Sequence, residues 1–561
     1  MGGIVEEIST VLVQALAEAL ETARSNGDLT IETAPDFIVE VPREKGNGDF
    51  ATNLAMLLAK PARMAPRKIA EILVSYTNVN KTWLDRTEIA GPGFINFYLK
   101  PAWIFDSIPQ IIRENTNYGR VNIGNGQKVQ VEFVSANPTG LLHMGNARGA
   151  ALGDSIAAIL DFAGFDVARE FYINDTGNQI DNFGYSLEAR YLQLLGRDVP
   201  FPEDGYHGED LIATVKVYIE RCGESLLDVT NSERQTALVD YALKEKLTAI
   251  KNTLADFMVD YDLWFSERAL HQSGAVQETL ELLREKGHTY ENEAAVWLKS
   301  TTWGAEKDDV LIRSNGTPTY FLVDIAYHRD KFLRGFERVI DIWGADHHGH
   351  VARMKGAIGA MGFDPAALEV VIMQLVRLYQ GGEPVRMSKR SGMYVTLEEL
   401  VEDVGLDAAR YFFIMRGADS HLDFDLDLAK AQSNENPVYY IQYAHARICS
   451  ILRQQFNQGG TSSTEETIDF SRLQEESELN LARKLVDFPG EVTTAAKGMA
   501  PQRIARYVHD LAGLLHSFYN ANRVITDDEQ LSKVRLALVD ATRITLRNAL
   551  KLLGLTAPEQ M

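Results

Sequence analysis

Apolar residues return at every fourth position at the start of the chain, at Ile4, Ile8, Leu12, Leu16 and Leu20. This spacing places them on one face, so the chain is predicted to open with an amphipathic helix. A second helical pattern follows residues 48–55, and residues 88–99 alternate like a strand after a Gly-Pro-Gly turn. Residues 1–110 are therefore expected to form a small α+β domain, followed by an Asn- and Gly-rich linker at 115–127.

The clearest local pattern comes next. Val129, Val131 and Phe133 alternate as in a strand, and apolar residues then recur at helical spacing from 152 to 163. Ala163-Gly164 breaks that helix, and residues 165–173 read as a second strand. Strand, helix and strand within about 45 residues indicate a βαβ unit, hence a parallel sheet with a right-handed crossover.

The rest of the chain divides by pattern into an insertion, a return to strands and a helical end. Residues 195–210 are rich in Pro, Gly and acid, and residues 211–286 are mostly helical in pattern. Strand patterns return at 317–326, 339–343 and 370–375. We therefore predict a multidomain α/β fold: a parallel-sheet domain over residues 120–405 with a helical insertion at about 190–290, and an all-α domain over residues 406–561.

Composition narrows the possible partners and compartments. The 561 residues include 56 Lys and Arg against 78 Asp and Glu, a net charge of −22, so a polyanion must be met by local basic patches. Two cysteines, Cys222 and Cys449, exclude a disulfide framework and a cysteine-based zinc site. No apolar run approaches the roughly 20 residues that span a bilayer, and no signal-peptide pattern opens the chain. We expect a cytoplasmic protein that does not bind membranes.

One candidate for phosphate chemistry is the stretch S-A-N-P-T-G-L-L-H-M-G-N at residues 135–146. It lies where the first strand of the βαβ unit gives way to its helix, and a helix N-terminus offers unpaired N–H groups and partial positive charge to a phosphate. Gly145 leaves room for a nucleotide on the backbone, and the His143 imidazole can donate a hydrogen bond as charge develops. An isolated motif of this kind is more often simple helix capping.

A second candidate, V-R-M-S-K-R-S-G at residues 385–392, places three cations within five residues. Gly381 and Gly382 precede it, so the loop can fold over a triphosphate and stabilise a leaving pyrophosphate. A solvated basic loop is the plainer interpretation of this stretch alone. The two motifs are informative together: 246 positions separate His143 from Lys389.

As a pair, H-M-G-N resembles the "HIGH" element and R-M-S-K-R the "KMSK" element of class I aminoacyl-tRNA synthetases. Stretches at 131–140, 172–179, 316–327, 343–350, 436–447 and 516–520 further resemble arginyl-tRNA synthetases, and the similarity covers nearly the whole chain. Two departures are visible. Asn146 replaces the usual final His, so it cannot carry charge there. Thr139-Gly140 stand where many members have a Lys, while Lys389 is retained.

The resemblance implies a Rossmann-like catalytic domain, an N-terminal tRNA-contacting domain and a C-terminal anticodon-binding domain. It also implies an arginine–tRNA ligase that forms arginyl-adenylate from ATP, releases pyrophosphate and charges the 3′-terminal ribose of its tRNA. The implied catalytic residues are His143, Asn146, Arg386 and Lys389. The implied ATP-binding residues are His143, Gly145, Asn146, Asp346, His347, Met387, Ser388 and Lys389.

Arginine recognition requires carboxylates, because a guanidinium is a planar fork of five donors. By resemblance the arginine-binding residues are Glu132, Asn137, Tyr320 and Asp324, and the Tyr-x-x-x-Asp spacing places the last two on one face if their segment is helical. Aromatic and Arg side chains can stack on splayed bases. The implied tRNA-binding residues are Tyr439, Tyr440, Tyr443 and Arg447 in the helical domain, and Phe50, Asn53 and Asn96 in the N-terminal domain.

Mg²⁺ is expected to accompany ATP, and no protein-bound metal is expected. The triple-His stretch at 346–350 favours nucleotide contact over zinc, because no cysteine supports a zinc site and adjacent His residues cannot easily share one ion. The protein is expected to be a monomer.

Three alternatives remain at this point. A class I synthetase for another amino acid is opposed by Glu132, Tyr320 and Asp324. A nucleotidyltransferase that adenylates a small molecule without tRNA is opposed by the helical C-terminal part with its aromatic and basic stretch. A non-catalytic RNA-binding relative is opposed by the intact His143 and Lys389.

Overall fold

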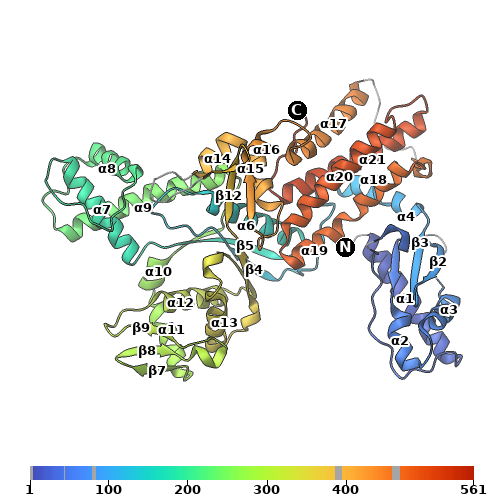
Figure 1. Ribbon diagram of the computed structural model, residues 1–561, viewed down its shortest axis with the longest axis horizontal. Helices are drawn as coiled ribbons and strands as arrows, with labels where there is room; N and C mark the ends of the chain where they lie inside the picture. The colour runs from blue at the N-terminus through green and yellow to red at the C-terminus, as the bar shows by residue number, and fades with distance from the viewer. Residues whose placement is uncertain (1–3, 43, 79–83, 386–394, 458–467) are drawn as a thin grey trace.

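The computed structural model describes residues 4–42, 44–78, 84–385, 395–457 and 468–561. Its centre is a parallel sheet of five strands in the order β11-β10-β4-β5-β6. These strands are β4 Lys128–Glu132, β5 Asp166–Ile173, β6 Leu263–Ser266, β10 Arg338–Gly344 and β11 Leu368–Met373. Helix α6, Met144–Phe162, connects β4 to β5, so the predicted βαβ unit and the parallel sheet are confirmed (Figure 1).

Helices cover both faces of this sheet. Val131 and Ile340 pack into the core that contains α6, whereas Val339 and Leu368 pack into the core that contains α12, Tyr320–Leu333, and α13, His350–Met361. The chain runs outward from β4 through β5 on one side and places β10 on the other. The carboxyl ends of β4 and β10 thus form a topological switch point, where open α/β sheets bind ligands.

Two parts of the secondary structure differ from the sequence prediction. Strand β6 lies inside residues 211–286, which were predicted to be mostly helical, and it forms the edge of the central sheet. Of residues 317–326, predicted to be a strand, residues 320–326 instead open helix α12. A short apolar run is compatible with either a buried strand or a buried helix. Helix α12 is such a case, because the sheet and α13 both bury it.

The helical insertion projects from the sheet at one end of the molecule (Figure 1). It consists of α7 Asn178–Leu194, α8 Glu209–Cys222 and α9 Asn231–Asp256, whose apolar faces share one core. Beyond β6 follow α10 Glu267–Gln272, α11 Ala275–Glu285 and a small antiparallel sheet of β7 Thr289–Asn292, β8 Ala295–Leu298 and β9 Asp309–Ile312.

The N-terminal domain lies at the opposite end of the molecule (Figure 1). Its elements are α1 Ile4–Ser25, β1 Phe50–Thr52, α2 Leu54–Ala62, α3 Pro66–Tyr76, β2 Leu84–Ala90 and β3 Phe94–Leu99, and its antiparallel sheet has the order β1-β3-β2. Helices α4, Ala102–Phe105, and α5, Ser107–Glu114, lead from it to the central body, where α5 packs on α21.

The last third of the chain is mostly helical. It contains α14 Leu397–Val404, α15 Leu406–Ile414, α16 Leu426–Lys430, α17 Pro437–Asn457, α18 Glu476–Val486, α19 Phe488–Gly498, α20 Pro501–Ala521 and α21 Glu529–Leu552. A small sheet joins β12 Val376–Gln380 to β13 Glu383–Pro384 and β14 Leu422–Asp425. Among the described residues, none of the helices is both long and apolar enough to cross a membrane.

Candidate active site

Helix α6 begins with a reciprocal capping arrangement built by His143 and Asn146. The Nδ1 atom of His143 accepts a hydrogen bond from the backbone N–H of Gly145 at 3.1 Å, and Oδ1 of Asn146 accepts one from the backbone N–H of His143 at 3.1 Å. Because Nδ1 is the acceptor, the proton of a neutral ring lies on Nε2. A Cβ atom at Gly145 would lie 2.9 Å from the His143 ring, so only glycine leaves this ring in place.

A first cavity, of about 430 Å³, opens between the start of α6 and the carboxyl ends of β10 and β11. It lies at the switch point between β4 and β10 described above. Five of the residues predicted to bind ATP line it together: His143, Gly145, Asn146, Asp346 and His347. Helix amides, glycine backbone and an imidazole in one apolar-walled cavity form a suitable site for a nucleotide with its phosphates toward α6.

The second motif meets the first through its flanking residues. Arg386, Met387, Ser388 and Lys389 lie outside the described residues. Before them, the Val385 N–H donates to the Leu378 carbonyl at 2.8 Å; after them, Thr396 forms a β-bridge with His143, and the Leu397 N–H donates to the Leu142 carbonyl at 2.9 Å. The chain thus returns directly beside His143 after the second motif.

A second cavity, of about 910 Å³, shares Asp346 and His347 with the first. Tyr320 and Asp324 line it from successive turns of α12, in agreement with their predicted common helix face. The Asp324 carboxylate lies 3.1 Å from Nε2 of His350, and its side chain is 39% exposed. An exposed carboxylate beside a tyrosine can bind a guanidinium.

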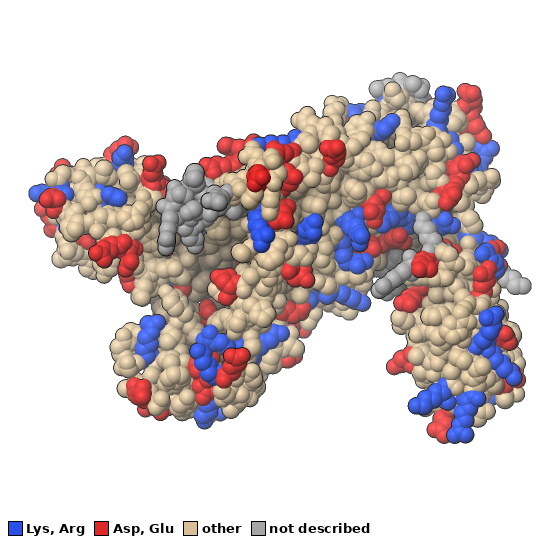
Figure 2. All heavy atoms as spheres, in the orientation of Figure 1, with Lys and Arg blue, Asp and Glu red and all other residues tan. Residues whose placement is uncertain are grey.

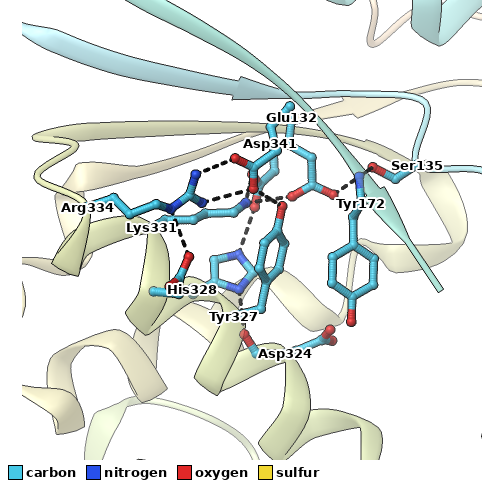
Figure 3. A network of polar contacts seen from close by, with 11 residues as sticks. Glu132, Ser135, Tyr172, Asp324, Tyr327, His328, Lys331, Arg334 and Asp341 are labelled. Atoms are coloured by element: carbon cyan, nitrogen blue, oxygen red, sulfur yellow. Dashed lines mark hydrogen bonds and ion pairs between the residues drawn. The ribbon is translucent and has the colours of Figure 1, made fainter. Parts of the chain in front are cut away.

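Glu132 and Asn137, also predicted to bind arginine, line neither of these two cavities among the described residues. Asn137 donates to the Gln179 side chain at 2.8 Å. Glu132 is buried at the end of β4 and bonds to Lys331 Nζ at 2.6 Å and to Ser135 Oγ at 2.8 Å (Figure 3). Glu132 is thus part of a buried polar network and does not line either cavity.

This network was not anticipated from the sequence. Lys331 also bonds to Asp341 at 2.8 Å, and His328 joins Asp341 at 2.8 Å to the backbone carbonyl of Asp324, also at 2.8 Å (Figure 3). Burial raises the pKa of Glu132, and Lys331 only partly opposes this. For Asp341, Lys331 and His328 outweigh burial and lower the pKa to about 2. A sequence signal did exist, since His328, Lys331 and Arg334 recur every third position in an apolar helix.

Family models match most of the chain. The arginyl-tRNA synthetase N-terminal domain matches residues 6–99, the class I (R) tRNA synthetase catalytic domain matches 107–200 and 213–424, and the DALR anticodon-binding domain matches 441–561. The chain belongs to the arginyl-tRNA synthetase family.

Relatives and solved structures agree with this membership. Two relatives named arginine–tRNA ligase come from Desulforamulus reducens, 64% identical with 100% of both chains covered, and Desulfitobacterium hafniense, 60% identical with 99% of both covered. The Thermus thermophilus arginyl-tRNA synthetase structure has a TM-score of 0.75 at 25% identity, covering 98% of this chain and 99% of that one. A Campylobacter jejuni structure described as a putative arginyl-tRNA synthetase has a TM-score of 0.74 at 33% identity, covering 82% of this chain and all of that one.

In this arginyl-tRNA synthetase, the predicted aromatic residues of α17 form a stacked surface group. The Tyr439 and Tyr443 rings lie 6.2 Å apart and nearly parallel, and the Arg447 guanidinium lies 3.6 Å from the centre of the Tyr519 ring on α20. Tyr440 is half-buried against His516, with ring centres 4.6 Å apart. The structure therefore brings Tyr439, Tyr440, Tyr443 and Arg447 together on one part of the α17–α20 surface.

The N-terminal domain gives a different result. Phe50 and Asn96 are buried, and Phe50 packs against Trp103 in the domain core. Both side chains are thus covered in this structure, and their expected contact with tRNA stays a prediction. Asn53, at the N-cap of α2, is half-buried and retains some exposed surface.

Proposed function

We propose that this arginyl-tRNA synthetase binds ATP in the first cavity and arginine in the second. As an arginine–tRNA ligase, it forms arginyl-adenylate from arginine and ATP and then charges its tRNA. One observation supports the assignment of the cavities: they meet at Asp346 and His347, so ligands in the two cavities would meet at this boundary. The boundary is where a carboxylate from one ligand can reach a phosphate of the other.

In the first step, a carboxylate oxygen of arginine attacks the α-phosphorus of ATP in line. A carboxyl–phosphate bond forms, the α–β phosphoanhydride bond breaks and pyrophosphate leaves. The backbone N–H groups at the start of α6 and the His143 Nε2 proton would stabilise the charge on the phosphate oxygens. Arg386 and Lys389 would neutralise the pyrophosphate, and Met387 and Ser388 would contact the nucleotide.

In the second step, a hydroxyl of the terminal ribose attacks the carbonyl carbon of the adenylate, and AMP leaves. Neither step needs a covalent enzyme intermediate, so the rate comes from orientation and electrostatics. Asn146 would contribute by holding the His143 backbone and by hydrogen bonding, because its amide carries no charge.

Mg²⁺ would be carried in with ATP, where it neutralises phosphate charge. Mg²⁺ is usually held by substrate phosphates and one or two carboxylates. Asp346 fits this requirement, because its exposed carboxylate lines both cavities. The described part of the chain has no group of three or more His, Cys, Asp or Glu suited to a metal ion.

For arginine, we propose that Asp324 and Tyr320 bind the guanidinium from α12. The Asp324 carboxylate already lies 3.1 Å from Nε2 of His350, and a guanidinium can take that place with two parallel hydrogen bonds. Glu132, which is buried and lines neither cavity, would be the second carboxylate of the arginine site. Asn137 would hold the amino or carboxylate group of arginine.

For tRNA, we propose that Tyr439, Tyr440, Tyr443 and Arg447 stack on anticodon bases, and that the N-terminal domain contacts the tRNA near Asn53. Figure 2 shows several basic side chains on the N-terminal domain, with acidic ones among them. With a net charge of −22, such local basic side chains would have to meet the tRNA. The proposed division is residues 1–110 for tRNA contact, 120–405 for catalysis and 406–561 for the anticodon. We also propose a cytoplasmic monomer.

The test is ATP–pyrophosphate exchange with each amino acid in turn, with and without tRNA. Of the amino acids tested, only arginine is expected to support exchange. Lysine and citrulline should support none, because neither side chain pairs fully with the carboxylates of the arginine site. Exchange with another amino acid, or none with arginine under either condition, would reject the assignment. Mixing ATP with arginine analogues that lack the carboxylate should give no exchange.

A further inference from the structure

Three buried carboxylates form a row across the central sheet. In the strand register, Asp341 of β10 lies opposite Glu132 of β4, and Glu132 lies opposite Glu170 of β5. Directly paired residues of neighbouring parallel strands point to the same face, and strands lie about 4.8 Å apart. All three residues are under 9% exposed. Three adjacent buried acids repel one another unless cations balance them.

Helix α12 supplies those cations. Lys331 bonds to both Glu132 and Asp341, at 2.6 and 2.8 Å, and Arg334 bonds to both oxygens of Glu170, at 2.6 and 3.0 Å. His328 takes the other oxygen of Asp341, at 2.8 Å. The spacing of three residues between His328, Lys331 and Arg334 keeps them on the face that covers the carboxylate row (Figure 3).

The same helix carries the arginine-facing residues one and two turns earlier. Asp324 lies one turn before His328, and its backbone carbonyl accepts the His328 Nδ1 proton at 2.8 Å. The contacts of Lys331 and His328 with Glu132 and Asp341 therefore fix how far Asp324 extends into the second cavity.

Glu132 also controls the turn after β4. Its Oε1 accepts from Ser135 Oγ at 2.8 Å, and that hydroxyl accepts the Tyr172 N–H at 3.1 Å. Val134 and Ser135 have positive φ angles of 69° and 39°, a strained conformation for a β-branched residue. With Lys331 on one oxygen and Ser135 on the other, the Glu132 carboxylate has a single orientation.

We propose that Lys331 is a positioning residue for arginine recognition, which holds the Glu132 carboxylate in place and anchors the helix that presents Asp324. The proposal rests on the assignment of Glu132 and Asp324 to the arginine site. Burial favours the neutral form of Glu132 and raises its pKa, so the carboxylate needs a cation at contact distance to stay charged. Lys331 itself stays protonated, because Asp341 and Glu132 outweigh its burial and raise its pKa.

The first experiment compares Lys331→Met with Arg334→Met in the full-length enzyme, by KM for arginine and for ATP in aminoacylation. Arg334 is the matched control, because it balances the far end of the same row. We expect Lys331→Met to raise the arginine KM about tenfold or more while the ATP KM changes less than about twofold, since a recognition charge is lost and the phosphate site is not. Arg334→Met should change the arginine KM by less than about threefold, because Arg334 bonds to Glu170 and Asp330 rather than to Glu132. Equal rises in both KM values after Lys331→Met, or an unchanged arginine KM, would overturn the proposal.

A charge-balanced variant covers the case in which Lys331→Met does not fold. Lys331→Met combined with Asp341→Asn removes one buried cation and one buried anion and leaves Glu132 in place. The arginine KM should remain raised about tenfold with the ATP KM kept, because Glu132 still lacks its cation. Recovery of the wild-type arginine KM would overturn the positioning role of Lys331 and show that Lys331 only balances the buried negative charge.

Glu132→Gln separates this inference from the assignment on which it rests. If Glu132→Gln leaves the arginine KM unchanged, Glu132 is not part of the arginine site and the assignment itself fails. If Glu132→Gln raises the arginine KM and Lys331→Met does not, only the role of Lys331 fails. A rise in both variants, with no further rise in the Glu132→Gln, Lys331→Met double variant, is the expected result, because the two residues act through one interaction.

Discussion

The Arg410 guanidinium donates to the Asp154 carboxylate across 2.5 Å and so ties α15 to α6, the helix whose N-cap is His143. Arg410 is fully buried, and its other nitrogens donate to the Phe257 carbonyl at 2.7 Å and the Leu553 carbonyl at 3.1 Å. One side chain thus joins the catalytic helix, the end of the helical insertion and the end of the last helix. We expect this junction to hold the anticodon-binding helices in a fixed relation to the active site.

Arg410→Met should therefore lower the free energy of unfolding by about 3–5 kcal/mol, because the fully buried guanidinium loses its bonds to Asp154 and to two backbone carbonyls. Asp154 would keep only its longer contact with Arg169, at 3.4 Å. Urea denaturation followed by circular dichroism measures this change. Arg120→Met is the matched control, since Arg120 makes an exposed pair with Asp161 on the same helix, and its loss should cost about 1 kcal/mol or less. Equal losses of unfolding free energy in the two variants would show that the buried Arg410 contacts stabilise the fold no more than the exposed Arg120 pair does.

Asn146 offers a way to separate helix capping from phosphate contact. Asn146→Asp keeps the acceptor for the His143 N–H and suits a helix N-terminus, so the unfolding free energy should change by less than about 0.5 kcal/mol. Its new negative charge in the first cavity should raise the KM for ATP about tenfold. Asn146→Ala should instead lower stability by about 1 kcal/mol through the lost cap. An unchanged ATP KM in Asn146→Asp would remove this side chain from the phosphate site.

Asp324→Asn should weaken arginine binding far more than ATP binding. The change keeps the shape of the side chain and removes the charge that faces the second cavity, so the arginine KM should rise about 100-fold, or about 3 kcal/mol. Steady-state aminoacylation with each substrate varied in turn measures both constants. Asp330→Asn, on the same helix but paired with Arg334, is the control and should leave the arginine KM within about threefold. Parallel rises in the arginine and ATP constants would place Asp324 outside the arginine site.

The α6 side of the first cavity could be predicted from the sequence because its parts are local. His143, Gly145 and Asn146 are neighbours on one helix start, and the βαβ pattern already places that start at the carboxyl edge of the sheet. The carboxylate row could not be predicted, since Asp341, Glu132 and Glu170 meet only through strand register. The same limit explains β6: four residues beside long helices carry too little pattern to show that they pair with β5.

The aromatic surface of the helical domain should act on tRNA and not on the small substrates. Tyr443→Leu combined with Arg447→Gln removes a stacking ring and the cation beside it, while the buried side of α17 keeps its packing. The KM for tRNA should rise about tenfold or more, at the usual value of about 1–3 kcal/mol for one stacked base. The KM values for arginine and ATP should not change. A tRNA KM equal to that of the wild type would show that the anticodon contact lies elsewhere on the domain.

His445 should make the C-terminal end of the chain sensitive to acid. Its Nδ1 proton is donated to the Pro558 carbonyl at 2.9 Å, and its Nε2 is buried with no partner among the described residues. Burial, aided by Arg543 and Arg547, lowers its pKa below the usual 6.5. The unfolded chain therefore binds a proton near pH 6.5 while the folded chain resists it, so stability is lost as the pH falls below 6.5.

His445→Asn, whose amide can still donate, should remove up to about 1.4 kcal/mol of this loss per pH unit. Denaturation midpoints of both proteins from pH 7.5 to 5 measure it, and groups common to both cancel in the difference. Parallel pH profiles would show that His445 takes up its proton without disturbing the fold.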